Sequence, residues 1–123
     1  MKELYLNYGY TPDKEAIDRS LELIASNLEN LVSDSVIKEC FSLMDLTSLH
    51  NADSVDSITK LMEKVNTYRD IYPGYPLPAS VCVYPNLAHV VKECRKEEAV
   101  HVTAVAGCFP TSQSFIEVKT KEC

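Results

Sequence analysis

The segment ASVCVY, from Ala79 to Tyr84, has the sequence of a short buried β-strand, and Pro85 stops it directly. Two further apolar runs share this character, one from Leu43 to Thr47 (LMDLT) and one from Val100 to Ala106. Each run is followed by residues with the apolar spacing of an amphipathic helix. Strands that alternate with helices and carry nearly continuous apolar residues are typical of a parallel sheet covered by helices. The sequence therefore predicts an α/β fold.

The helices that follow the strands are each expected to bury one apolar stripe. The first begins near Asp53, which can cap it, with Asp56 in its first turn. The second runs from Asn86 to about Lys96, and Thr111 or Ser112 can cap a last helix near the end of the chain. The residues expected to face inward are Val55, Ile58, Met62 and Val65 in the first helix and Leu87, Val90, Val91 and Cys94 in the second.

Two helices are expected ahead of the first strand. Thr11 can cap the first of them, Pro12 suits its first position, and apolar residues then recur at steps of four and three. This apolar stripe consists of Ile17, Leu21, Ile24, Leu28 and Leu31. It is too short for a coiled coil, so we expect it to pack against the body of the domain. The second helix runs from Ser33 to about Ser42. Its inward residues are expected to be Val36, Ile37, Cys40 and Phe41.

Three parallel strands form only part of a sheet, because a closed (β/α)₈ barrel needs about 250 residues and this chain has 123. We therefore predict a partial (β/α)₈ TIM barrel, with two leading helices followed by about three βα units. Residues 1–42 would form the N-terminal helical extension and residues 43–123 the first three βα units of an incomplete barrel. An open sheet of this kind exposes two edges, so we expect the isolated chain to be marginally stable, to self-associate or to form a homo-oligomer.

Composition and charge limit the classes of partner. The net charge of −6 provides no general electrostatic footprint for nucleic acid or an anionic membrane. No apolar run approaches the roughly 18 residues of a membrane span, and the N-terminus lacks a secretory signal, so a cytoplasmic location is expected. The five cysteines form no CxxC pair and the three histidines are scattered. These features favour reduced thiols and disfavour a disulfide framework or a metal site.

Asp45 is the unusual residue of the first strand. Side chains alternate between the two faces of a strand, so Asp45 and Thr47 share one face and Leu46 lies on the other. A lone carboxylate between apolar neighbours must meet a cation, a set of hydrogen-bond donors or water in a cavity. The alternative is that Asp45 caps the strand end or bonds to loop amides.

The second strand also has a polar face, formed by Ser80, Cys82 and Tyr84. Cys82 could line a pocket there, or it could fill space in the core. His101 lies near the start of the third strand, away from the expected catalytic end, which favours a structural or solvated role. The turn at Gly107 lacks the spacing of a nucleotide-binding loop, and the chain has no GxSxG motif.

Three stretches together resemble deoxyribose-phosphate aldolase, a family of class I aldolases with a TIM-barrel fold. They are LMDLTSL (Leu43 to Leu49), ASVCVYPN (Ala79 to Asn86) and VAGCFPTSQ (Val105 to Gln113), in the order of the family. The likeness runs from about Phe41 to the end of the chain. Cys108 departs from the pattern, because members of the family commonly have a second glycine at this position.

The resemblance implies retro-aldol cleavage of 2-deoxy-D-ribose 5-phosphate to glyceraldehyde 3-phosphate and acetaldehyde, through a lysine Schiff base and without a metal or cofactor. By the same likeness, Asp45 belongs to the proton-relay network, Thr47 contacts the phosphosugar substrate, and Cys82 lines the acetaldehyde side of the pocket. The Schiff-base lysine and the phosphate-binding loops of the family lie on later strands. None of the three predicted strands here contains a lysine, so we expect the isolated chain to be inactive.

Two other classes of function are compatible with the sequence. The chain could be a catalytically dead α/β module that binds a partner through an uncovered sheet edge. It could also be a redox sensor that uses Cys82 or Cys108, in which case the sensor thiol should react faster than an ordinary free cysteine.

Overall fold

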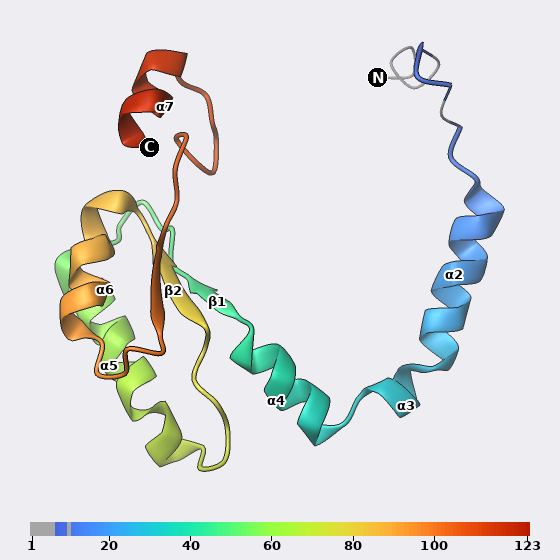
Figure 1. The fold of residues 1–123 in the computed structure, drawn as a ribbon, viewed down its shortest axis with the longest axis horizontal. Helices are drawn as coiled ribbons and strands as arrows, with labels where there is room; N and C mark the ends of the chain where they lie inside the picture. Colours follow the sequence, from blue (N-terminus) through green and yellow to red (C-terminus); the bar gives the residue numbers. More distant parts are fainter. Residues whose placement is uncertain (1–6, 10) are drawn as a thin grey trace. The chain divides into compact units, whose positions relative to one another are not determined.

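The computed structural model describes residues 7–9 and 11–123 (Figure 1). The chain divides into two compact units, residues 1–36 and residues 37–123. In chain order the elements are α2 (Lys14–Ser26), α3 (Leu28–Leu31), α4 (Asp34–Ser42), β1 (Asp45–Thr47), α5 (Val55–Ile71), β2 (Ser80–Val83), the 3₁₀ helix η1 (Pro85–Leu87), α6 (Ala88–Cys94), β3 (His101–Ala104) and α7 (Ile116–Glu122).

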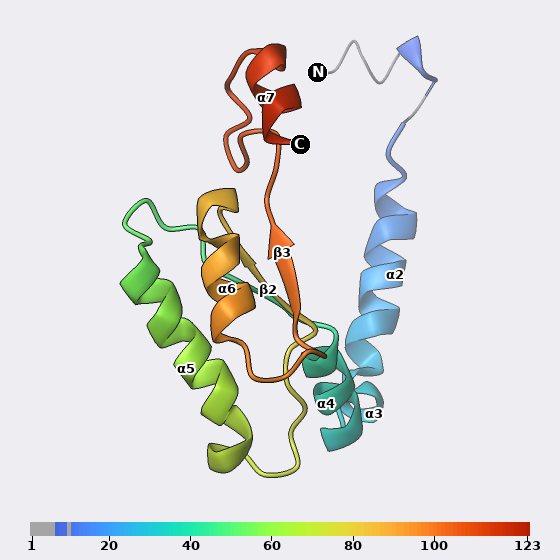
Figure 2. The ribbon, with the colours of Figure 1, turned by 60° about the vertical axis from the view of Figure 1, so that its left-hand side comes forward.

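The second unit contains a small parallel sheet with the strand order β1-β2-β3 (Figures 1 and 2). Asp45 pairs with Ser80, and Ser80 pairs with His101, which fixes the register across the sheet. The prediction of a parallel sheet with intervening helices is confirmed. Each strand is shorter than predicted. Strand pairing begins two residues after Leu43 in β1, and one residue after Ala79 and Val100 in β2 and β3.

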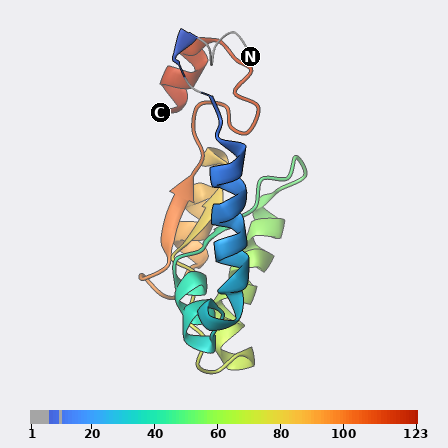
Figure 3. The ribbon, with the colours of Figure 1, turned by 90° about the vertical axis from the view of Figure 1, so that its right-hand side faces the viewer.

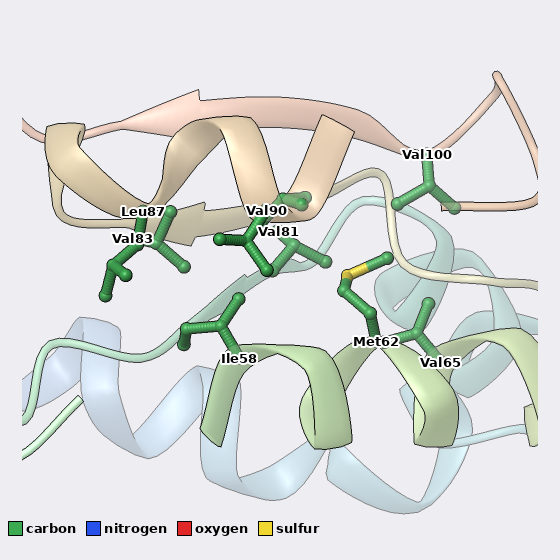
Figure 4. Close-up of a cluster of buried hydrophobic side chains, with 9 residues drawn as sticks. Ile58, Met62, Val65, Val81, Val83, Leu87, Val90 and Val100 are labelled. Atoms are coloured by element: carbon green, nitrogen blue, oxygen red, sulfur yellow. The ribbon is translucent and has the colours of Figure 1, made fainter. Parts of the chain in front are cut away.

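One face of the sheet is covered by α5 and α6, which lie side by side (Figure 2). Ile58, Met62 and Val65 of α5 point toward Val81 and Val83 of β2, as Figure 4 shows. The helix after β2 completes the core with Leu87, Val90 and Val91, and Val100 closes the end next to β3. The inward residues of the two helical segments were predicted, with two differences: Val55 is exposed and Cys94 is only partly buried.

The start of α5 differs from the prediction by one residue. Ser54, rather than Asp53, is the N-cap, and its hydroxyl accepts a hydrogen bond from the Ser57 N–H. The Ser57 hydroxyl in turn accepts from the Ser54 N–H, which makes a reciprocal capping box. Asp53 is excluded from this role because its carboxylate bonds to Ser48 and to the His50 N–H in the preceding loop.

The end of α6 is tied to α5 by one side chain. The Asn66 amide nitrogen donates to the Cys94 carbonyl at 2.9 Å, and its oxygen accepts from the Lys96 N–H at 3.0 Å. Asn66 therefore satisfies backbone groups that the end of the helix leaves without intrahelical partners. Lys96, which was predicted to be helical, lies outside α6.

The last helix starts later than predicted. It begins at Ile116 after Phe115, and neither Thr111 nor Ser112 caps it. Ser112 instead has a φ of 52°, a left-handed conformation that does not lead into a helix. In Figures 1 and 2, α7 stands beyond the carboxyl end of β3 and apart from α5 and α6.

In the first unit the helix begins at Lys14, and Asp13 is its N-cap through a hydrogen bond from the Ala16 N–H. The predicted cap at Thr11 is therefore wrong, because the Asp13 carboxylate holds that role. Asn27 separates α2 from α3 and interrupts the predicted single stripe. No residue of α2 or α3 is buried, so the packing expected of the stripe stays a prediction.

The helix α4, which leads into β1 in Figure 3, buries less than predicted. Val36, Ile37 and Cys40 are exposed, which contradicts the inward face expected for them. Phe41 alone of the four is half-buried, because its ring stacks on Tyr68 of α5 with the ring centroids 4.9 Å apart. Within the part of the chain that the structure describes, no helix is both long and apolar enough to cross a membrane.

Candidate functional site

The face of the sheet opposite α5 and α6 is polar. The register aligns Asp45, Ser80 and His101 in one row across the strands, and Thr47, Cys82 and Thr103 in the next. Paired residues of parallel strands project to the same side, so the three residues predicted from sequence share one face with Ser80. The structure therefore brings Asp45, Thr47 and Cys82 together.

Asp45 meets a donor, although not in a buried setting. The Ser80 hydroxyl donates a hydrogen bond to the Asp45 carboxylate. Asp45 itself is exposed, whereas Ser80 is buried with 8% of its surface accessible. Of the partners expected for this carboxylate, the structure shows a hydrogen-bond donor; the strand itself is not buried, because β1 lies at the edge of the sheet and only Leu46 in it is partly covered.

The Cys82 thiol lies in the middle of this face and is 5% exposed. Burial raises the pKa of Cys82 above its ordinary value, and the negative charge of Asp45 raises it further. A hydrogen bond with Thr47 acts in the opposite direction on the same pKa. Cys82 is therefore a neutral thiol near pH 7, which suits the lining of a pocket and does not suit a nucleophile or a redox sensor.

The Thr47 side chain also forms a hydrogen bond to the backbone of its own strand, β1. Its hydroxyl donates to the Asp45 carbonyl at 3.1 Å. Because β1 reaches β2 through the Met44 carbonyl and the Ser48 N–H, the backbone groups of the alternate residues Asp45 and Thr47 face the open edge. Thr47 thus satisfies one edge carbonyl that no neighbouring strand reaches.

A cluster in the loop after β1 was missed by the sequence analysis. The Ser48 hydroxyl donates to Asp53 at 2.8 Å and lies 3.3 Å from Nδ1 of His50. The same Nδ1 is 3.8 Å from the Asp53 carboxylate. In a catalytic triad the serine bonds to one ring nitrogen of the histidine and the aspartate bonds to the other. Here Ser48 and Asp53 both lie beside Nδ1 of His50, so the three residues do not form a triad. The available signal was the spacing Ser-x-His-x-x-Asp directly after a strand, at the end where parallel sheets place their sites.

Tyr84 and the turn after β3 complete this end of the sheet. The Tyr84 hydroxyl donates to the Leu49 carbonyl at 3.0 Å, which ties the end of β2 to the loop after β1. Gly107 and Cys108 have φ values of 69° and 59°, so Cys108 adopts the left-handed conformation that glycine accepts most readily. The Cys108 N–H donates to the Glu122 carboxylate at 2.6 Å.

No strand of this sheet contains a lysine. Among residues 7–9 and 11–123, no group of three or more His, Cys, Asp or Glu side chains is arranged to hold a metal ion. The histidine of the polar face, His101, is exposed. The face therefore presents a carboxylate, hydroxyls, a neutral thiol and an imidazole, which can orient a polar substrate and exchange protons with it.

The fold and this face define an α/β protein with a small parallel sheet, covered on one side by helices and polar on the other. A comparison with models of known protein families finds no match for this chain.

Proposed function

We propose that this chain is the amino-terminal part of a Schiff-base aldolase with a TIM-barrel fold, which cleaves 2-deoxy-D-ribose 5-phosphate to glyceraldehyde 3-phosphate and acetaldehyde. The main support is the common face shared by Asp45, Thr47 and Cys82. These residues belong to the stretches that resemble the aldolase family. In this proposal, further βα units extend the sheet toward a closed barrel.

The chemistry assigns one task to each side chain. A lysine amine condenses with the substrate aldehyde, and the resulting iminium accepts the electrons of the carbon–carbon bond that breaks. Asp45, oriented by Ser80, accepts and returns protons beside this lysine. Thr47 positions the sugar, and the neutral Cys82 thiol borders the two-carbon product. The lysine itself would come from a later strand, since β1, β2 and β3 contain none.

Borohydride trapping tests the proposal. The 123-residue chain, incubated with acetaldehyde and reduced, should form no stoichiometric adduct at a single lysine. An extended chain, obtained by reading the encoding DNA past Cys123, should form such an adduct on a strand lysine. A specific adduct on the short chain, or its absence from an extended chain with the further βα units, would contradict the proposal.

The role of Asp45 has its own test in the extended chain. Asp45→Asn should lower kcat/KM by about 100-fold or more, the usual effect of losing a positioned acid–base group. Asp56→Asn is the matched control, because this carboxylate is exposed on α5 and pairs only locally with Lys60 at 2.7 Å. Equal activity of the two variants would remove Asp45 from the mechanism.

The open sheet edges favour a second candidate, a catalytically dead module that binds a partner. Among the strands that the structure describes, both β1 and β3 have a side without a neighbour, and exposed edges accept further strands. A genuine stop codon after Cys123, together with failure of the trapping experiment, would favour this candidate over the aldolase.

A further inference from the structure

The hydroxyl of Ser80 is a buried polar group that the hydrophobic core does not explain. Val81 and Val83 of the same strand pack into the core, whereas the side chain of Ser80 alternates with them and lies on the polar face. Ser80 is 8% exposed, and a buried hydroxyl without a partner costs free energy. Its hydroxyl donates to the carboxylate of Asp45. The hydrogen bond that satisfies Ser80 is therefore also one that holds Asp45.

The two residues joined by this hydrogen bond differ in how firmly they are held. Ser80 lies in the middle strand, where it pairs with Asp45 of β1 on one side and with His101 of β3 on the other. Asp45 is exposed, so its carboxylate can rotate among several staggered conformations unless a bond selects one. Ser80 is therefore the fixed donor, and the carboxylate is the group whose position depends on it.

The hydrogen bond also distinguishes the two oxygens of the carboxylate. Ser80 donates to Oδ1 of Asp45, and a hydroxyl has one proton to donate. A proton exchanged with a substrate would then pass through Oδ2. A fixed carboxylate also keeps its charge at a constant place relative to Cys82, which lies in the next row of the same face. The thiol of Cys82 therefore reports where this charge lies, because the charge raises its pKa.

We propose that Ser80 is a positioning residue, whose hydroxyl holds Oδ1 of Asp45 and leaves Oδ2 to exchange the proton of the reaction. The inference rests on the proposed function for the identity of that reaction. The positioning itself is a property of β1 and β2 and can be measured in the 123-residue chain without any activity. It requires a hydroxyl on the β-carbon of residue 80, which serine and threonine provide.

The pH titration of Cys82 tests the positioning. NMR follows the thiol through the chemical shift of its β-carbon in the wild-type chain and in Ser80→Ala. Without the Ser80 hydroxyl the carboxylate should rotate into water, where its charge acts on the thiol over a greater distance and through a higher dielectric. The pKa of Cys82 should therefore fall in Ser80→Ala, in the same direction as in Asp45→Asn and by no more.

A matched pair of variants separates the hydroxyl from the packing of residue 80. Threonine and valine have nearly the same shape, but only threonine has a hydroxyl. Ser80→Thr should keep the wild-type pKa of Cys82, and Ser80→Val should lower it. This pair also decides the question if Ser80→Ala does not fold. Thr103→Val is the control and should leave the pKa unchanged, because Thr103 pairs with Cys82 from β3, on the far side of β2 from Asp45.

A double variant separates the positioning of a charge from a change in the burial of Cys82. In an Asp45→Asn background, Ser80→Ala should leave the pKa of Cys82 unchanged, because no charge remains to be positioned. An equal fall in the presence and absence of the Asp45 charge would overturn the positioning role. So would a wild-type pKa of Cys82 in both Ser80→Ala and Ser80→Val.

The titration and the trapping experiment can fail independently. If the extended chain forms no trapped adduct, the aldolase is contradicted and the titration still decides the positioning. In an active extended chain, Ser80→Ala should lower kcat by about tenfold or more with KM within about twofold, because Ser80 acts through Asp45 and not on the bound sugar. Ser80→Thr should restore kcat. A wild-type kcat in Ser80→Ala would contradict the positioning and leave the aldolase in place.

Discussion

The Cys82 thiol is the residue whose titration best reports the geometry of the polar face. Its pKa is raised by burial and by Asp45, and lowered by Thr47. Asp45→Asn should therefore lower the pKa of Cys82, and Thr47→Val should raise it. The pH dependence of iodoacetamide labelling, followed by mass spectrometry with Cys123 as the exposed reference, measures both shifts. Shifts of the same sign in the two variants would contradict the arrangement.

The same thiol makes stability fall at alkaline pH. Its pKa is higher in the folded chain than the ordinary 9.0, so the folded state keeps a proton that the unfolded chain releases. The contribution of Cys82 is complete below the ordinary pKa and is lost as the pH rises through the folded pKa. Urea denaturation should show this loss in the wild type and a smaller loss in Cys82→Ala. An equal alkaline loss in both proteins would exclude Cys82 as its source.

Cys108 has a φ of 59°, in the left-handed region that a side chain disfavours. Cys108→Gly should stabilise the folded chain by about 1 kcal/mol, because glycine adopts this conformation without the steric cost, less its larger entropy loss on folding. Chemical denaturation measures the change, and Cys40→Gly in α4 is the control that should destabilise. A destabilised Cys108→Gly chain would contradict the assigned backbone geometry.

Among single residues, the sequence was informative about faces and uninformative about partners. Alternation along a strand was enough to put Asp45 with Thr47, and Ser80 with Cys82. The hydrogen bond from Ser80 to Asp45 depends on the register between β1 and β2, which neither strand encodes alone. The exposure of Asp45 also depends on its strand being at the edge of the sheet, a property of the assembled fold.

Among the elements, α5 offers the clearest test of local stabilisation. Its capping box joins Ser54 and Ser57 through two reciprocal hydrogen bonds. Ser54→Ala should destabilise the fold by about 1 kcal/mol, since the Ser57 N–H would lose the hydroxyl that accepts its hydrogen bond. Ser57→Ala should cost less after Ser54→Ala than alone, which a double-mutant cycle from urea denaturation measures. Additive effects would show that the two bonds act independently.

Helix and strand identities were predictable because their apolar periods differ, but their ends were not. Asp53 and Ser54 are both good caps, and only the loop bonds of Asp53 to Ser48 and His50 decide between them. Likewise Val55 fits the α5 stripe by spacing, yet it lies in the first turn and is 56% exposed. Burial at such positions depends on how far the neighbouring strands extend.

For the whole molecule, the buried sheet and the last helix of the second unit should differ sharply in protection against hydrogen exchange. All four residues of β2 are buried, and Val81 and Val83 belong to one core cluster with Met62 of α5. No residue of α7 is buried. Amides of β2 and α6 should therefore exchange slowest, and those of α7 near the rate of an isolated helix. Met62→Ala should abolish protection in β2 and leave α7 unaffected, as measured by mass spectrometry. Equal protection of α7 and β2 in the wild type would contradict this difference.

The Asn66 side chain, which joins α5 to the end of α6, makes the fold sensitive to deamidation. Slow hydrolysis of an asparagine amide to aspartate replaces the nitrogen with a second oxygen. At this position the new carboxylate would face the Cys94 carbonyl, to which the amide nitrogen now donates at 2.9 Å. Two oxygens with no proton between them repel each other. Deamidation of Asn66 would therefore weaken the contact between α5 and the end of α6.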